Sequence, residues 1–352
     1  MQKSFLQKTW VVAGVAFLCS ALWGSAFAGV KIGYELFHIV SADWAAQMVF
    51  AGIRFAIAGV MALVGGSIVA KQALIPQKQT IPKIGIISLF QTILQYFFYY
   101  IGLAHTTGVN AAIIVAANVF IAILLSTLVY RIEKMTAAKL FGCVIGFLGI
   151  ILCNLNGLKG GIHLSFLGDG FIFLCTVASG FSSVLMKKYA ASENPILLSG
   201  WQFLFGGVVM FAVGLLFGGR MEHITGSAIA ILLYLSFVSA AAYSLWSLLL
   251  KYNPVSKVAV FGFLNPICGV CISTIFLKEK DAFHIFTIPA LIFVCVGIYI
   301  VNHKKQNACG SYVAAYFFST NIEKADAPFQ QVFKNLWKEH PLYCFIFSEC
   351  FY

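Results

Sequence analysis

The sequence predicts an all-α integral membrane protein of ten transmembrane helices, arranged as two inverted five-helix repeats. Three observations lead to this fold class: the composition is too apolar for a water-soluble chain, apolar stretches recur at membrane-spanning length, and the second half repeats the first. Of the 352 residues, 61% are hydrophobic and 10% are charged, whereas a soluble domain carries roughly 25% charged residues. Lipid is therefore the expected solvent for most of the chain.

Apolar stretches follow one another from Trp10 to Asn302 with only short polar breaks. Each approaches the roughly 17 to 25 residues with which an α-helix crosses about 30 Å of hydrocarbon. The ten predicted spans are Trp10–Ile32, Trp44–Ala70, Ile84–Ala104, Val109–Tyr130, Ala137–Cys153, Leu164–Met186, Pro195–Phe217, Ala228–Leu250, Val255–Leu277 and Phe283–Val301. No sizeable soluble domain fits between them.

Basic residues near the span ends set the expected orientation. With the N-terminus in the cytoplasm, fourteen of them fall on the cytoplasmic side and five outside, and such an excess marks the cytoplasmic side. We expect a multi-pass protein of the cell membrane with both termini in the cytoplasm. The net charge of +11 does not indicate nucleic-acid binding, because Lys and Arg occur singly or in pairs rather than in a basic block.

An internal repeat relates the last two spans of each half. Val109 aligns with Val255 and Glu133 with Glu279, both at a separation of 146 residues (255 − 109 and 279 − 133). After a shift of two residues, the segment that begins at Gly149 lies over the one that begins at Gly297 (297 − 149 = 148). Any one match between apolar helices can be coincidence, but matched Glu and Asn residues are harder to explain that way. The sequence therefore predicts a duplicated unit.

Each unit holds five spans, so the second unit enters the membrane from the opposite side and the two are inverted. The expected boundaries are a cytoplasmic N-terminus over residues 1–9, a first repeat over 10–154, a second repeat over 155–302 and an atypical tail over 303–352. The tail is either an interfacial amphipathic helix or an extension without a role. Inverted repeats are a recurrent plan of secondary transporters.

Short motifs occur in a fixed order along both halves. They are Leu22–Phe27 with Lys31–Gly33, Ile53–Phe55, Gly108–Ala112, Leu167–Asp169, Asn265–Pro266 and Leu277–Lys280. In order and spacing they resemble EamA-type members of the drug/metabolite transporter superfamily over residues 10–302. One departure is Phe120, which aligns with Pro266 where the family usually has proline in both repeats. The resemblance implies transport of small metabolites through a central cavity lined by the first, third, fourth, sixth, eighth and ninth spans.

Polar and aromatic side chains inside the spans are the candidate substrate pathway, because polar groups in lipid are costly unless they face a cavity or a partner helix. The candidates are Trp23, Ser25, Gln91, Gln95, Tyr96, Tyr99, Asn118, Tyr243, Trp246, Asn265 and Pro266. Gln91 and Gln95 lie four residues apart on one helix face, and Tyr243 with Trp246 could stack on a planar substrate. The alternative is that Gln and Asn only bond neighbouring helices.

Three charged residues are candidates for a structural or a gating role. Arg54 lies well inside the second span, where its charge demands a partner. Glu133 and Glu279 lie at span ends beside Lys and Arg residues, where surface ion pairs are the alternative to gating.

No Asp or Glu occurs in the middle of a predicted span, so proton antiport through a membrane carboxylate is disfavoured relative to facilitated diffusion or exchange. The same absence argues against an aspartyl-protease-like enzyme, which needs two carboxylates. No Walker sequence occurs that would indicate ATP-driven transport. Cys268 and Cys271 have no second pair or His partner that would complete a metal site, and no cofactor is expected.

The predicted function is secondary transport of small metabolites such as amino acids or related compounds, with export by alternating access. The expected partners are a small-molecule substrate and the lipid bilayer. The competing interpretation is a non-transporting scaffold or receptor on the same duplicated fold. The sequence leaves the substrate, the coupling ion and the oligomeric state open.

Overall fold

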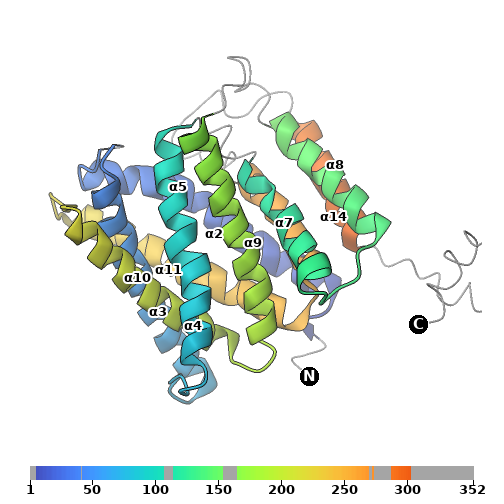
Figure 1. Ribbon diagram of the computed structural model, residues 1–352, viewed down its shortest axis with the longest axis horizontal. Coiled ribbons are helices and arrows are strands. Elements are labelled where there is room, and N and C mark those ends of the chain that lie inside the picture. Colours follow the sequence, from blue (N-terminus) through green and yellow to red (C-terminus); the bar gives the residue numbers. More distant parts are fainter. Residues whose placement is uncertain are drawn as a thin grey trace, which may run out of the picture. The chain divides into compact units, whose positions relative to one another are not determined.

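Helices are the only regular elements across the residues that the computed structural model describes, which are 5–40, 42–106, 114–153, 165–268, 272 and 287–302. Figure 1 shows their arrangement. The elements are α2 (Thr9–Leu36), α3 (Trp44–Ala70), α4 (Ile81–Ser88), the π-helical η1 (Leu89–Leu94), α5 (Gln95–Ala104), α7 (Asn118–Leu124), the π-helical η2 (Leu125–Val129), α8 (Ala137–Cys153), the π-helical η4 (Phe166–Gly170), α9 (Phe171–Tyr189), α10 (Pro195–Leu216), α11 (Gly226–Tyr252), α12 (Val255–Ala259), the 3₁₀ segment η5 (Val260–Phe263) and α14 (Thr287–Asn302).

The membrane-spanning prediction is confirmed. Within the described ranges, six helices are long and apolar enough to cross a bilayer, and four shorter apolar helices fall where the remaining spans are expected. The four are Ile114–Val129, Ala137–Leu152, Val255–Cys268 and Ile288–Asn302. Several predictions lie outside the described residues: the position of Glu279, the motifs Gly108–Ala112 and Leu277–Lys280, and the nature of the tail over 303–352.

Short polar side chains start several helices where the chain re-enters the apolar region. The Asp43 carboxylate accepts a hydrogen bond from the Ala46 N–H at 2.9 Å, and the Asn194 side chain accepts one from Ile196 N–H at 2.9 Å. Thr225 does the same for Ala228 at 3.2 Å. These caps satisfy N–H groups that have no partner within their own helix.

Large apolar side chains cover the outside of the bundle. Val60, Val64 and Ile68 of α3 are exposed, as are Phe205 and Val208 of α10. A soluble protein rarely leaves contiguous apolar faces in water, whereas hydrocarbon is a good solvent for them. Polar groups of the same two helices point the other way and are buried.

Glycines bring two helix pairs into close backbone contact. A Cβ built on Gly207 of α10 would lie 2.4 Å from the backbone N of Ala56 in α3. A Cβ on Gly142 of α8 would lie 2.8 Å from the carbonyl oxygen of Gly297 in α14. Figure 1 shows α8 and α14 side by side. Small residues are the usual means of close helix packing in lipid, where the hydrophobic effect does not drive helices together.

Helix contacts follow the internal repeat. In chain order, the second span packs on the seventh, the fifth on the tenth, the fourth on the ninth, the first on the eighth and the third on the sixth. If each span is exchanged with its equivalent in the other repeat, five places along the chain, the same five pairs result. The pair of the first and eighth spans, for example, becomes the pair of the sixth and third. Partners run in opposite directions: along α3 and α10, Gly52 meets Phe211 and Gly66 meets Ile196. Two inverted five-helix repeats account for this pattern.

Candidate functional site

An aromatic cluster fills the middle of the bundle between α2, α3, α5, α10 and α11. The rings of Phe55 and Phe203 stack at 5.2 Å between centroids, and Tyr96 lies 4.5 Å from Phe55. Tyr243 packs edge-on against Phe203 at 4.9 Å and against Trp23 at 5.1 Å. These contacts connect side chains from five helices into one cluster.

Polar atoms of this cluster are only partly satisfied. The hydroxyls of Tyr96 and Tyr243 bond each other at 2.9 Å. The buried indole Nε1 of Trp23 has no hydrogen-bond partner, and neither has the hydroxyl of Ser244, the residue that follows Tyr243 on α11. Buried polar groups are normally paired, so unpaired donors at this depth are the atoms to which a bound molecule could add partners.

Several rings of the cluster keep accessible surface although they lie inside the bundle. Tyr96, Tyr99, Tyr243 and Trp246 are half-buried rather than fully packed. Trp246 also meets Trp23 at 5.1 Å between ring centroids. Four candidates from the sequence, Tyr96, Tyr243, Trp23 and Trp246, are thus connected by direct contacts.

Arg54 lies at the edge of the cluster with 4% of its surface exposed. Its Nη2 donates to the Ser239 hydroxyl at 3.0 Å and its Nε to the carbonyl oxygen of Leu235 at 3.4 Å. The guanidinium carbon lies 5.2 Å from the centre of the Phe55 ring. Phe55 in turn packs against Tyr96 at 4.5 Å between ring centroids, and this contact connects Arg54 to the tyrosines of the cluster.

The second repeat has a neutral counterpart of Arg54. Gln202, which is fully buried, accepts a hydrogen bond from the Thr92 hydroxyl at 2.6 Å. Gln202 follows Arg54 by 148 residues (202 − 54), and Ser239 follows Thr92 by 147 (239 − 92). Both repeats therefore join their second helix to the third helix of the other repeat through a polar side chain, charged in one case and neutral in the other.

The remaining pathway candidates are more dispersed. Gln91 is buried in η1, and a π-helical segment of this kind occurs frequently at functional sites. Ser25 forms a hydrogen bond with the Tyr234 hydroxyl at 2.6 Å, on the more exposed side of α2 and α11.

Asn118, in the fourth span, donates a hydrogen bond to Ser179 of α9 at 3.1 Å. The side-chain carbonyl oxygens of Asn118 and Asn265 are both buried without a partner, one in each repeat. Pro266, which follows Asn265 directly, is half-buried.

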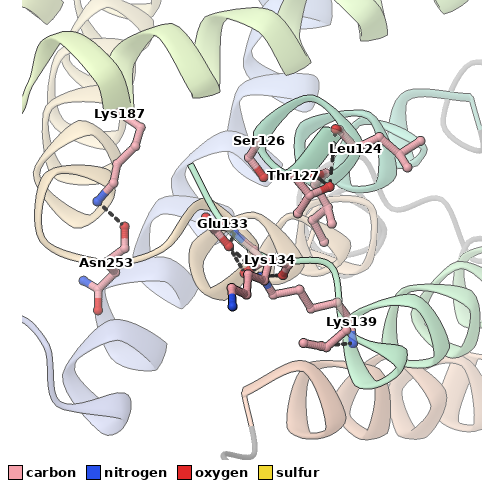
Figure 2. A network of polar contacts seen from close by, with 11 residues as sticks. Leu124, Ser126, Thr127, Glu133, Lys134, Lys139, Lys187 and Asn253 are labelled. Atoms are coloured by element: carbon pink, nitrogen blue, oxygen red, sulfur yellow. Dashed lines mark hydrogen bonds and ion pairs between the residues drawn. The ribbon is translucent and has the colours of Figure 1, made fainter. Parts of the chain in front are cut away.

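A second polar region lies on the face of the bundle on which α2 begins. Glu133 accepts hydrogen bonds from the Ser256 N–H at 3.2 Å and from its hydroxyl, and pairs with Lys139 Nζ at 3.0 Å. Lys187 donates to the carbonyl oxygen of Asn253 at 2.7 Å. Figure 2 shows Glu133 beside Lys139 and Lys187 pointing toward Asn253. Glu133 thus ties the loop between two first-repeat spans to the start of α12 in the second repeat.

A buried acid lies near the opposite face, at the start of the sixth span. Asp169 of η4 accepts hydrogen bonds from the Thr106 hydroxyl at 2.5 Å and from the Ser165 N–H at 2.7 Å. Both its partners lie at helix ends, so Asp169 fastens α5 to α9 rather than facing the aromatic cluster.

Comparison with known proteins places this architecture in a family. The model of the EamA-like transporter family matches residues 10–155 and again residues 166–303. The chain belongs to the EamA-like transporter family. It is accordingly a multi-pass membrane transporter and not an enzyme, and its environment is a lipid bilayer.

Several curated proteins resemble this EamA-like chain. An uncharacterized transporter of Archaeoglobus fulgidus is 25% identical over 304 residues, which cover 85% of this chain and all of that protein. The uncharacterized transporter YvbV of Bacillus subtilis is 27% identical over 71% of this chain and 82% of its own. A chloroplastic WAT1-related protein of Arabidopsis thaliana is 24% identical over 58% of this chain and 51% of its own.

A solved crystal structure shares the fold of this EamA-like transporter. It superimposes with a TM-score of 0.66 over 84% of this chain and 96% of the other, at 16% identity. Identity at this level supports the fold alone.

Sequence reasoning missed some members of the cluster in this EamA-like transporter. Tyr34, Tyr100, Phe203 and Ser239 all contact or surround Arg54 and the tyrosines. Tyr100 lies four residues after Tyr96 on the same helix face, a spacing that could have indicated it. Phe203 and Ser239 carry no such signal, because ordinary apolar and small residues surround them in sequence.

Proposed function

We propose that this protein is a secondary transporter that exports small metabolites, such as amino acids or related compounds, from the cell by alternating access. The cluster of half-buried rings and unpaired donors in the middle of the bundle carries this proposal. A packed structural core would have no reason to keep polar atoms unsatisfied in the hydrocarbon region.

The bond between Glu133 and Ser256 supports a closed gate on one face. Both residues lie where a loop of one repeat meets the other repeat, and both are part-buried. Alternating access requires such contacts to break when the opposite face closes. We assign Glu133 this gating role, and Glu279, its equivalent in the other repeat, lies outside the described residues.

Transport down the substrate gradient without proton coupling fits the distribution of acids. The described spans contain two acids, Glu35 and Asp169, and both lie near helix ends. The bonds of Asp169 to Thr106 and Ser165 fix it there. A carboxylate that exchanges protons with substrate would have to face the pathway.

Flux through purified protein in liposomes tests the proposal. Loaded vesicles should release substrate faster than protein-free vesicles, without a proton gradient and without ATP. Strict dependence of uphill accumulation on a pH gradient would refute the uncoupled mechanism. A protein that binds small molecules but moves none across the vesicle membrane would instead be the scaffold or receptor on this fold.

A further inference from the structure

Arg54 carries a positive charge into the bilayer without a negative partner. Its described neighbours are a backbone carbonyl, the Ser239 hydroxyl and the Phe55 ring, all of them neutral. The carboxylates of the described chain lie at helix ends or in loops, and none of them forms an ion pair with Arg54. A buried cation in a low-dielectric medium is costly unless an anion or several hydrogen bonds compensate it.

The surroundings of Arg54 are rich in hydrogen-bond donors. A guanidinium has five N–H groups, and the structure assigns two hydrogen bonds to that of Arg54. Trp23 of the same cluster and Ser244, which follows Tyr243 on α11, add an unpaired N–H and an unpaired O–H. Gln95, the residue before Tyr96, has an unpaired side-chain oxygen that can accept one of them. A donor-rich site with one uncompensated positive charge fits a ligand with acceptor atoms and one negative charge.

Packing alone does not require the charge of Arg54. At the equivalent position of the other repeat, Gln202 links its two helices through a neutral amide bonded to Thr92. The same helix–helix connection is therefore made once with a charge and once without. The charge at Arg54 needs a reason beyond holding α3 to α11.

We infer that the substrate is an organic monoanion, whose carboxylate or similar group pairs with Arg54 while a planar apolar portion lies against the aromatic cluster. This inference rests on the proposed transport function and names the substrate class of the same site. Arg suits this role because its planar fork matches the two oxygens of a carboxylate. The rings of Tyr243, Trp23 and Trp246 provide flat apolar surface for the remainder of the molecule.

Ring-matched ligands separate charge from shape. Phenyl and naphthyl compounds with the same short chain would be offered as the carboxylate, the amide and the amine. Binding to the purified full chain in detergent would be followed by the ligand-induced shift in Tm. The wild-type protein should bind at least one carboxylate ten times more tightly than its amide or amine.

Variants of Arg54 test the assigned partner. Arg54→Gln places in the first repeat the residue that the second repeat has, so it should fold, lose the tenfold preference for the carboxylate and keep amide binding. Arg54→Lys should retain a weaker preference, and Arg220→Gln, which removes an exposed positive charge, should behave as wild type. Unchanged carboxylate preference in Arg54→Gln overturns the assignment.

The wild-type ligand series decides the question even if Arg54→Gln does not fold. Equal or tighter binding of the amides or amines, or no binding of any carboxylate, overturns the inference. Flux measurements keep it distinct from the transport proposal. Arg54-dependent carboxylate binding without flux contradicts transport alone, whereas flux of cations or neutral compounds only contradicts the anionic substrate alone.

Discussion

Hydroxyl groups connect helices at the centre of this protein, where backbone atoms cannot. Each membrane-spanning helix already pairs its own N–H and C=O groups internally, so contacts between helices depend on side chains. The bond between Tyr96 and Tyr243 joins α5 of the first repeat to α11 of the second. Tyr96 also packs on Phe55, the ring beside the Arg54 guanidinium, so the same hydroxyls can hold the bundle and orient a bound anion.

Replacing Tyr243 by Phe should separate these two effects. The ring would keep its packing on Trp23 and Phe203, and the lost hydrogen bond should lower the free energy of unfolding by only about 0.5 to 1.5 kcal/mol. KM for the substrate should rise roughly tenfold, which corresponds to about 1.4 kcal/mol of lost binding. Liposome flux and thermal unfolding would be measured together.

Tyr234→Phe is the matched control for that substitution. Tyr234 is on the same helix, and its hydroxyl bonds Ser25 away from the cluster. Its variant should keep the wild-type KM. Equal losses of transport in the two variants would contradict a special position for Tyr243.

Glu193 gives the fold a predictable response to acid. The hydrogen bond from Lys83 Nζ at 2.6 Å lowers the pKa of Glu193 below its ordinary value of 4.5. The pair therefore stabilises the fold above about pH 4.5, and this contribution is lost as the pH falls through the lowered pKa. Because both side chains are partly exposed, the effect should be small.

Thermal unfolding across pH would check this. Glu193→Gln should lower Tm at neutral pH, and the gap to wild type should shrink under acid conditions. Glu222→Gln, which changes an exposed carboxylate on a loop, should show no such convergence. A gap that stays constant down to strong acid would contradict the ion pair.

Where two helices pack together, the distance between their backbones decides which glycines can be replaced by alanine without loss of stability. A Cβ on Gly59 would lie 2.6 Å from the backbone N of Leu204, while nothing lies within 4 Å of a Cβ on Gly65. Gly59→Ala should destabilise the protein by about 1 to 3 kcal/mol, because α3 and α10 must move apart. Gly65→Ala on the same helix should be neutral or stabilise it by up to about 1 kcal/mol. Tm values in one detergent would compare them, and similar values would contradict the close approach.

Gating at Glu133 is testable at the level of whole helices. Glu133→Gln removes the charge that pairs with Lys139 and weakens the acceptor for Ser256. The face where α2 begins should then open more often. Spin labels at Arg131 and Ser192, one in each repeat, should move toward longer distances in a background without other cysteines.

Two results would limit that interpretation. Glu222→Gln should leave the label distances at their wild-type values, since Glu222 lies on a loop away from this network. Unchanged distances in Glu133→Gln would show that the contact is only structural.

The ten helices were predictable because spanning length and apolar composition are properties of contiguous sequence. Several predicted bounds agree with the structure, as for Trp44–Ala70 and Ala137–Cys153. The candidate site was predictable only in part. Tyr96, Tyr243 and Trp23 stand out as polar aromatics within spans, but the contact of Arg54 with Ser239 joins residues 185 apart in sequence. Since these helices are apolar on nearly all sides, their sequence gives little indication of which face meets which neighbour.

The orientation of the chain in the membrane is a property of the whole molecule, because all span ends contribute to it. The excess of Lys and Arg near the span ends expected in the cytoplasm applies to all ten helices together. A reporter that is active only outside the cytoplasm should be silent when fused after Asn302 and active when fused near Lys159. The reverse result would contradict the assignment of both termini to the cytoplasm.

Arg54 and Gln202 also bear on why the two repeats are one polypeptide. In a dimer of identical five-helix subunits, every residue would occur twice about the central axis, so an arginine here would bring two like charges into the same lipid-enclosed space. Covalent fusion of the copies lets one differ from the other. This protein can therefore hold a single guanidinium beside its aromatic cluster, with the Gln202 amide at the equivalent position of the other repeat, and offer a lone anion one defined partner rather than two equivalent ones.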